Sequence, residues 1–193
     1  MKSDFIKIVE DIIRSCKDIE FDQPGFGGSN FLNHDGSLYY RWLARYIQVH
    51  TPKRSLELGR REGNSLYAMS YYLPDDCILD SYDLNMGGNV VKKPNVNVFE
   101  YSGNYSELDL SEYNFMFIDI NGVGEKEYEI YNQANEQGFE GIIAWDDVGS
   151  RWVENKEFWD LLPKDIKYKA PLHEGYGDVE CFGFTYHENS RRH

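Results

Sequence analysis

Three aspartates follow two apolar stretches of the sequence, and carboxylates are the side chains that hard divalent cations prefer. Asp119 ends one stretch, and Asp146 and Asp147 directly follow another. If the two stretches are adjacent parallel strands, all three acids meet at one sheet edge, where they repel one another unless a cation neutralises them. The pattern therefore predicts a site for Mg²⁺ or a similar ion. The alternative is that Asp146 and Asp147 cap the next helix or bond within a loop.

A glycine turn at residues 53–65 is the second feature with chemical content. Gly59 and Gly63 allow a tight turn and a close approach of ligand to backbone at a helix start, where unpaired N–H groups point outward. Glu57 precedes the first glycine, and a carboxylate there repels a pyrophosphate but attracts a cation. S-adenosylmethionine (SAM) carries an ammonium and a sulfonium and fits this charge. An ordinary strand–turn–helix connection stays open as the alternative.

Asp83 ends a further apolar stretch, about 20 residues after the glycine turn. An acid at this place can accept hydrogen bonds from both hydroxyls of a ribose. We therefore expect Asp83 to bind the ribose of a nucleotide-like ligand, with ordinary turn formation as the alternative.

The elements that must position these residues follow from the apolar spacing. Helical spacing predicts helices at 5–16, 38–50, 63–72 and 124–137, and another beginning near 153. Apolar runs bounded by turn residues predict strands at 55–58, 77–83, 96–100, 113–119, 141–145, 166–170 and 181–186. Strands that alternate with helices are typical of an α/β fold with a parallel sheet.

The glycine turn resembles the first motif of class I SAM-dependent methyltransferases, in the form Leu-Glu-Leu-Gly-x-x-x-Gly-x-Ser. With the strand-end acids, residues 38–186 resemble small metal-dependent O-methyltransferases, a family that includes antibiotic-tailoring and sugar-modifying enzymes. The resemblance implies a Rossmann-like three-layer sandwich whose seven-stranded sheet is mainly parallel and has an antiparallel last strand. It also implies a single methyltransferase domain over 1–193, with a helical cap at 1–50, a core at 51–187 and a tail at 188–193.

The resemblance further implies roles for single residues. The residues expected to bind SAM are Glu57, Gly59, Gly63, Ser65, Asp83, Ser102, Asn104 and Asp119, with Ser102 and Asn104 at the adenine. Asp119, Asp146 and Asp147 would hold the metal, and Asp119 would also serve as the base. Relatives often carry histidine or lysine shortly after the fourth-strand acid, whereas residues 120–123 contain neither. His173, in a late loop, is the second candidate for the base, and His34 and Tyr39 are candidate substrate contacts. An ordinary surface-loop histidine is the alternative for His34.

The strong negative charge of the chain disfavours nucleic acid as a partner. The chain has 20 basic and 33 acidic residues and a formal net charge of −13, which repels nucleic acid. Its three scattered cysteines favour a reducing compartment over a disulfide framework or a zinc site. No apolar run has membrane-spanning length. We expect a cytoplasmic protein with a small-molecule or glycan acceptor; self-association and membership of a larger multidomain protein are both left open.

The resulting hypothesis is a SAM-dependent O-methyltransferase, assisted by a divalent metal, that methylates a sugar or phenol hydroxyl. Two alternatives remain. A nicotinamide-dependent oxidoreductase could use a similar sheet, although Glu57 and the wide glycine spacing disfavour it. A non-catalytic binding module of the same fold is the other, because Gly122 stands where relatives carry a base.

Overall fold

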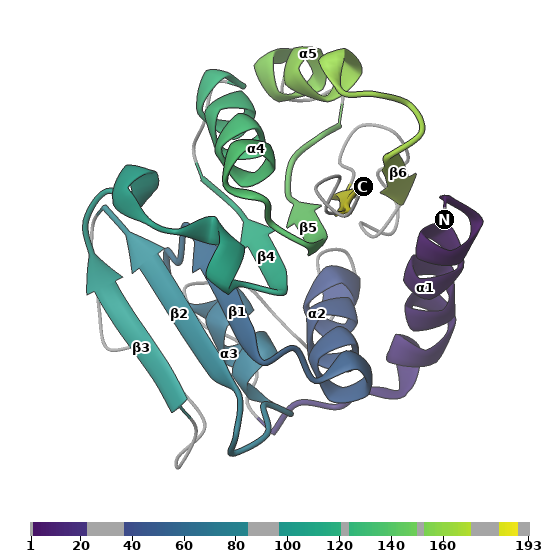
Figure 1. Cartoon of the computed structure of the whole chain (residues 1–193). Coiled ribbons are helices and arrows are strands. Elements are labelled where there is room, and N and C mark those ends of the chain that lie inside the picture. Colours follow the sequence, from purple (N-terminus) through teal and green to yellow (C-terminus); the bar gives the residue numbers. More distant parts are fainter. Residues whose placement is uncertain are drawn as a thin grey trace.

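A sheet with strand order β3-β2-β1-β4-β5-β7-β6 forms the centre of the computed structural model (Figure 1). The structure describes residues 2–22, 37–84, 97–120, 124–149, 153–170 and 182–188. Within these ranges the strands are β1 (Arg54–Leu58), β2 (Ile78–Asp83), β3 (Asn97–Ser102), β4 (Phe115–Ile118), β5 (Gly141–Trp145), β6 (Lys167–Ala170) and β7 (Phe182–His187). The first five are parallel, and β7 runs antiparallel to both β5 and β6. The predicted fold class is confirmed.

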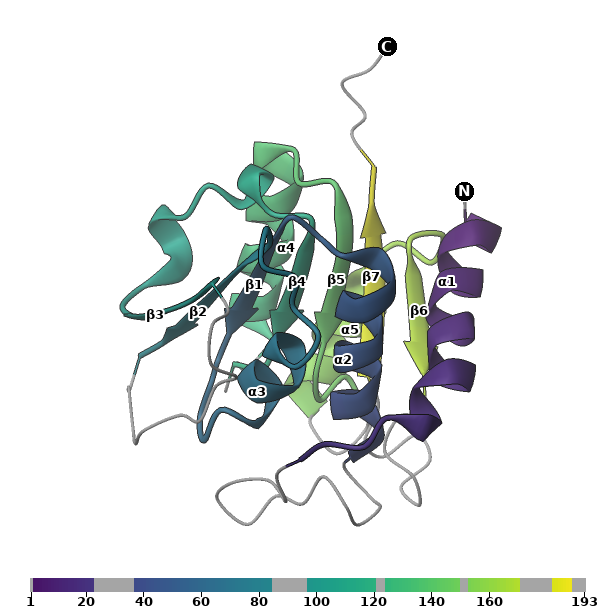
Figure 2. The ribbon, with the colours of Figure 1, turned by 90° about the horizontal axis from the view of Figure 1, so that it is seen from below.

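Helices cover both faces of the sheet. One face carries α1 (Lys2–Ser15), α2 (Ser37–His50) and α3 (Asn64–Ser70), and the other carries α4 (Glu125–Gln137) and α5 (Val153–Leu161) (Figure 2). Three short 3₁₀ turns, which the apolar pattern did not predict, complete the described elements: η1 (Cys16–Asp18), η2 (Tyr105–Glu107) and η3 (Leu110–Glu112). No helix in the described ranges has the length and apolarity needed to cross a membrane.

Two hydrophobic cores hold the three layers together, because the strand side chains alternate between the faces. On the first face, Trp42 of α2 lies fully buried with its ring 6.2 Å from that of Phe115 and 4.5 Å from that of Phe184. Its indole also donates to the carbonyl of Val9 at 3.3 Å and so joins α1 to α2. On the second face, Trp145 packs against Phe158 of α5 with ring centres 5.0 Å apart.

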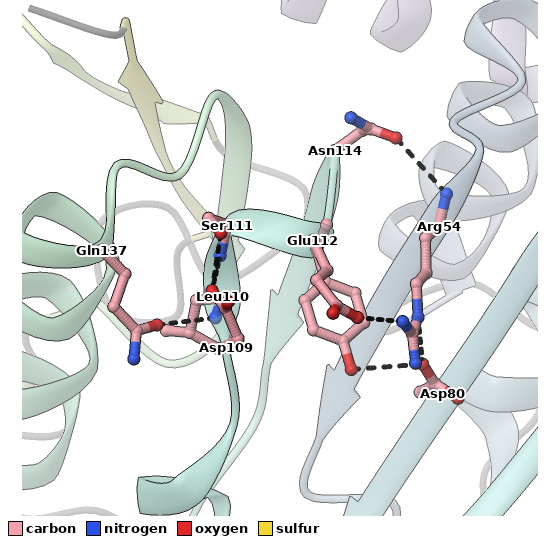
Figure 3. Close-up of polar contacts among 9 residues, drawn as sticks. Arg54, Asp80, Asp109, Leu110, Ser111, Glu112, Asn114 and Gln137 are labelled. Carbon is pink, nitrogen blue, oxygen red and sulfur yellow. Dashed lines mark hydrogen bonds and ion pairs between the residues drawn. The ribbon is translucent and has the colours of Figure 1, made fainter. Parts of the chain in front are cut away.

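The amino-terminal edge of the sheet is closed by a polar network around Arg54 (Figure 3). The Arg54 guanidinium donates to Asp80 Oδ2 at 2.7 Å, pairs with Glu112, and lies 5.0 Å from the centre of the Tyr113 ring. The Tyr113 hydroxyl donates to the same Asp80 oxygen at 3.1 Å. These contacts occupy the edge opposite the strand-end acids, and ligands of open α/β sheets bind at the carboxyl edge where those acids lie.

Candidate active site

The carboxyl ends of β1, β2, β3 and β4 border a cavity of about 250 Å³. Its lining residues are Leu58, Gly59, Arg61, Tyr82, Asp83, Leu84, Gly103, Tyr105, Asp119, Ile120 and Lys126. The cavity therefore extends from the acid that ends β2 to the acid that follows β4, which is where an open α/β sheet places a nucleotide-like ligand.

Three residues of the glycine turn have positive φ angles, and only two of them are glycines. Gly59 and Gly63 have φ values of 90° and 86°, and Arg61 between them has a φ of 45°. Gly59 donates its N–H to the Tyr82 carbonyl at 2.9 Å. A Cβ atom on Gly59 would lie 1.9 Å from the carbonyl oxygen of Asp119. Glycine is required here both by its backbone angle and by this close approach.

Asp83 organises the turn as well as lining the cavity. One carboxylate oxygen, Oδ2, accepts the backbone N–H groups of Arg60 and Arg61, each at 2.9 Å. The Arg60 side chain is buried and pairs with Glu100 on β3, which anchors the turn to the neighbouring strand. Asp83, the residue predicted to bind the ribose, thus lines the cavity.

Glu57 lies behind the cavity wall rather than on it. Its carboxylate is fully buried and accepts hydrogen bonds from the Ser65 hydroxyl at 2.5 Å and from the Ser81 hydroxyl. Burial raises the pKa of Glu57 to about 7, against the lowering effect of the two hydroxyls and of Arg60. Glu57 and Ser65 are therefore placed to fix the start of α3 and to contribute charge from behind Gly59.

The three predicted metal ligands do converge. One oxygen from each of Asp119, Asp146 and Asp147 lies within 4.8 Å of the others. Parallel pairing sets this geometry, since Asp119 N donates to the Leu58 carbonyl at 2.8 Å and Asp146 N to the Ile118 carbonyl at 2.9 Å. Asp147 adopts a φ of 56°, a left-handed conformation that aspartate tolerates better than most residues.

The acid cluster is electrostatically unbalanced. Burial raises the pKa of Asp119 well above its usual range, and the charges of Asp146 and Asp147 raise it further. The Arg61 guanidinium opposes these effects in part. Carboxylates in this arrangement gain stability from a proton or from a cation.

Tyr39 approaches the same acids from α2. Its ring is buried and stacks on Phe182 with the ring centres 5.2 Å apart. Burial raises the pKa of the Tyr39 hydroxyl, and Tyr40, Asp146 and Asp119 add to the effect. The hydroxyl therefore lies within electrostatic reach of the acid cluster, and the predicted contact of Tyr39 with the substrate stays a prediction. His34, the other predicted substrate contact, lies outside the described residues.

The other predicted ligands do not line the cavity. Ser102 and Asn104 are exposed, and the Asn104 side chain instead caps η2 by accepting the Ser106 N–H at 3.2 Å. Their sequence neighbours Gly103 and Tyr105 line the cavity instead. His173 lies outside the described residues, so its predicted role as a base stays a prediction.

Sequence reasoning missed several lining residues, among them Arg61, Leu84, Tyr105 and Lys126. Two of them had a local signal. Arg61 lies inside the glycine turn, and Leu84 directly follows the strand-end acid Asp83. Lys126 comes from the first turn of α4, whose approach to the sheet is a tertiary feature.

No protein-family model and no curated protein matches this sequence. Solved structures do match. An O-methyltransferase from Bacillus cereus in complex with S-adenosylhomocysteine (SAH) has 12% identity and a TM-score of 0.58 over 94% of this chain and 91% of the other. The O-methyltransferase of tomaymycin synthesis from Streptomyces achromogenes, bound to SAM, has 16% identity and a TM-score of 0.58 over 93% and 88%.

A third structure is the apo form of a TDP-rhamnose 3′-O-methyltransferase of calicheamicin biosynthesis, with 14% identity and a TM-score of 0.56 over 77% of each chain. At such identities the likeness establishes a shared fold. The chain has the fold of class I O-methyltransferases, as the glycine turn and the strand-end acids predicted.

Proposed function

We propose that this chain is a SAM-dependent O-methyltransferase that methylates a hydroxyl of a small molecule or carbohydrate with the help of a divalent cation. The observation that carries the proposal is that Asp119 belongs both to the cavity that contains Asp83 and to the acid cluster. A methyl donor and a metal-bound acceptor would therefore meet at one side chain. Structures of the same fold that contain SAM or SAH support this choice of donor.

The donor would bind along the cavity, with its ribose at Asp83 and its methionine end towards Asp119. Gly59 lets the backbone come close to the ligand, because no side chain stands between the turn and β4. Asp119 and the buried Glu57 supply negative charge beside the ammonium and the sulfonium. A dinucleotide would bring a pyrophosphate to the same place, which these acids disfavour.

The acid cluster fits a hard divalent cation. It offers three carboxylates within 4.8 Å of one another, and their mutual repulsion, expressed in the raised pKa of Asp119, is what an ion relieves. Asp119, Asp146 and Asp147 would hold Mg²⁺ or a similar ion. When bound, such an ion lowers the pKa of a hydroxyl and fixes its direction.

The proton of the acceptor hydroxyl needs a base, and Asp119 is the candidate within the described site. Its carboxylate belongs both to the cavity and to the acid cluster, where the acceptor hydroxyl would lie. The rest of the rate enhancement comes from alignment, because methyl transfer from sulfonium to oxygen removes a positive charge and needs an in-line approach. His173 remains the second candidate.

For the acceptor we favour a carbohydrate hydroxyl over a phenol. The loops expected at the cavity mouth are rich in Gly, Asn, His and Tyr. One protein of the same fold is a TDP-rhamnose 3′-O-methyltransferase. Methyl transfer to a panel of glycosides and catechols tests this choice, and turnover of catechols alone would contradict it.

Calorimetric titration with SAH, with and without Mg²⁺, tests the donor. We expect binding in both conditions, and no binding at millimolar ligand would remove the proposal. A product assay with excess acceptor separates an enzyme from a binding module of the same fold. Titration with NADH, followed by fluorescence, tests the oxidoreductase alternative, for which we expect no change.

A further inference from the structure

Arg61 is a cationic residue built into the wall of the cavity. It lies between the two glycines of the turn, with a φ of 45°, and its N–H donates to Asp83 Oδ2 at 2.9 Å. Non-glycine residues adopt this conformation at a cost that the surrounding structure must offset. The hydrogen bond to Asp83 fixes the backbone, and the side chain then lines the cavity.

Arg61 and Asp119 line the same cavity. The positive side chain therefore belongs to the cavity that ends at the acid cluster. Adjacent Arg60 has a different role, because its buried side chain pairs with Glu100. Arg61 is an exposed residue of the cavity lining, and among the described residues no ion pair engages its side chain.

The methyl donor carries a negative charge that acidic residues alone cannot bind. Its methionine end carries an ammonium and a sulfonium, which Asp119 and Glu57 attract, but also an α-carboxylate, which they repel. A guanidinium can bind a carboxylate through two parallel hydrogen bonds. A cation in the cavity wall can therefore bind this end of the donor, and Arg61 lines the same cavity as Asp119.

We propose that Arg61 binds the α-carboxylate of the donor and so selects for ligands with a complete amino-acid end. This inference rests on the proposed function. SAM and SAH satisfy this requirement. Their decarboxylated analogues lack the anion, and 5′-methylthioadenosine lacks the whole amino-acid end. Arg61 would then be a specificity-determining residue, distinct from Asp83, which would bind the ribose of all these ligands.

Lys126 provides the matched control. It lines the same cavity and carries the same charge. It comes, however, from the first turn of α4, which covers the opposite face of the sheet from α3 (Figure 2). The substitutions Arg61→Gln and Lys126→Gln each remove one positive charge from one cavity. General electrostatic attraction of the carboxylate would be lost in both variants, whereas a specific contact with Arg61 would be lost in only one.

The experiment measures the affinity of wild type and the two variants for SAH, for decarboxylated SAH and for 5′-methylthioadenosine by calorimetry. We expect wild type to prefer SAH over its decarboxylated analogue by about tenfold to a hundredfold, the contribution of a charge-assisted hydrogen bond. Arg61→Gln should bring that ratio close to one and leave the affinity for 5′-methylthioadenosine within about twofold. Lys126→Gln should keep the ratio, and Arg61→Lys should restore part of it.

Three results would overturn the inference. A preference that survives Arg61→Gln, or one that disappears in Lys126→Gln instead, would remove Arg61 from the role. Equal affinity of wild type for SAH and its decarboxylated analogue would do the same while leaving the methyltransferase proposal intact. Failure of wild type to bind any of the three ligands would remove the proposed function and this inference with it. Thermal unfolding of each variant confirms that a lost affinity does not reflect a lost fold.

Discussion

The backbones of Gly59 and Asp119 meet so closely that a Cβ atom on the glycine would lie 1.9 Å from the aspartate carbonyl oxygen. The glycine turn after β1 and the acid after β4 are therefore in direct contact, although 60 positions separate them in the sequence. The donor cavity and the acid cluster share this contact, because Gly59 and Asp119 both line the cavity. A disturbance at the turn should consequently reach both proposed ligand sites.

The first prediction concerns Gly59→Ala. The added methyl group meets backbone that cannot move without shifting β4, and the φ of 90° adds strain. We expect a loss of about 3 kcal/mol or more in the free energy of unfolding, together with loss of SAH binding. Chemical denaturation and calorimetry measure the two effects.

Gly138→Ala is the matched control for that substitution. Gly138 has a similar φ of 79°, but a Cβ atom there would meet nothing within 4 Å. Only the backbone strain is shared, so the expected loss is about 1 kcal/mol with unchanged SAH affinity. Equal losses in the two variants would show that backbone angle, and not the contact with Asp119, makes glycine necessary at position 59.

The second prediction concerns the charge of Glu57. Burial raises its pKa from 4.5 to about 7 in the folded protein. A raised carboxyl pKa means that the folded state prefers the protonated form, so the stability from this group is complete below about pH 4.5 and is lost as the pH rises through about 7. Glu57→Gln keeps the side chain neutral and should be more stable than wild type above pH 7 by roughly 3 kcal/mol.

Denaturation of both proteins at about pH 4, 6 and 8 checks this difference, which should vanish at the lowest pH. Glu62→Gln, an exposed substitution in the same turn, should change nothing at any pH. A constant difference between Glu57→Gln and wild type across the range would mean that the carboxyl does not titrate between these values.

The acids at the strand ends could be predicted from the sequence, whereas contacts between distant segments could not. Asp83, Asp119 and the pair Asp146–Asp147 could be placed from the sequence, because each follows an apolar strand and parallel strands deliver their ends to one edge. Ser102 and Asn104 were assigned to the cavity by resemblance, but their side chains are exposed, and Asn104 caps a 3₁₀ turn that periodicity does not reveal.

The surroundings of Glu57 could also be predicted only in part from the sequence. Its charge and its place before Gly59 were evident, and they predicted contact with a cationic ligand. The structure surrounds its carboxylate with the hydroxyls of Ser65 and Ser81. Ser81 is on a different strand, and its register against β1, which pairs Glu57 with Ser81, is set by packing that no local pattern encodes.

The third prediction concerns the acid cluster. Asp146→Asn removes one of three converging carboxylates and one cause of the raised pKa of Asp119, which should fall towards its usual range. Without metal the variant should be more stable than wild type, because like charges no longer repel. Its Mg²⁺ affinity should be lower by about tenfold to a hundredfold, since the ion loses an oxygen ligand.

Thermal unfolding with and without Mg²⁺ measures both effects. Asp75→Asn, at an exposed position before β2, removes the same charge away from the cluster and should leave the Mg²⁺ response as in wild type. If Mg²⁺ stabilises Asp146→Asn as much as wild type, the ion does not bind at these acids.

The last prediction concerns a buried hydrogen-bond chain beside β5 and β7. The Trp145 indole donates to Thr185 Oγ1 at 3.0 Å. With a neutral His187 ring that carries its proton on Nδ1, the Thr185 hydroxyl donates to His187 Nε2, also at 3.0 Å. His187 Nδ1 then donates to Asn135 Oδ1 at 3.0 Å. A proton on Nε2 would make the Thr185 oxygen accept a second hydrogen bond, and the Thr185 hydroxyl hydrogen would lose His187 as its acceptor, so a neutral ring fits this chain best.

Burial accordingly lowers the pKa of His187 from 6.5 to about 4. A lowered histidine pKa means that the folded state prefers the neutral form, so its stability is complete above about pH 6.5 and is lost as the pH falls towards 4. We expect wild type to lose roughly 3 kcal/mol across this interval through His187, and His187→Gln to lack that loss. Denaturation at several pH values compares the two slopes, with His50→Gln, at the exposed end of α2, retaining most of the wild-type slope. Parallel slopes for wild type and His187→Gln would contradict the proposed neutral chain.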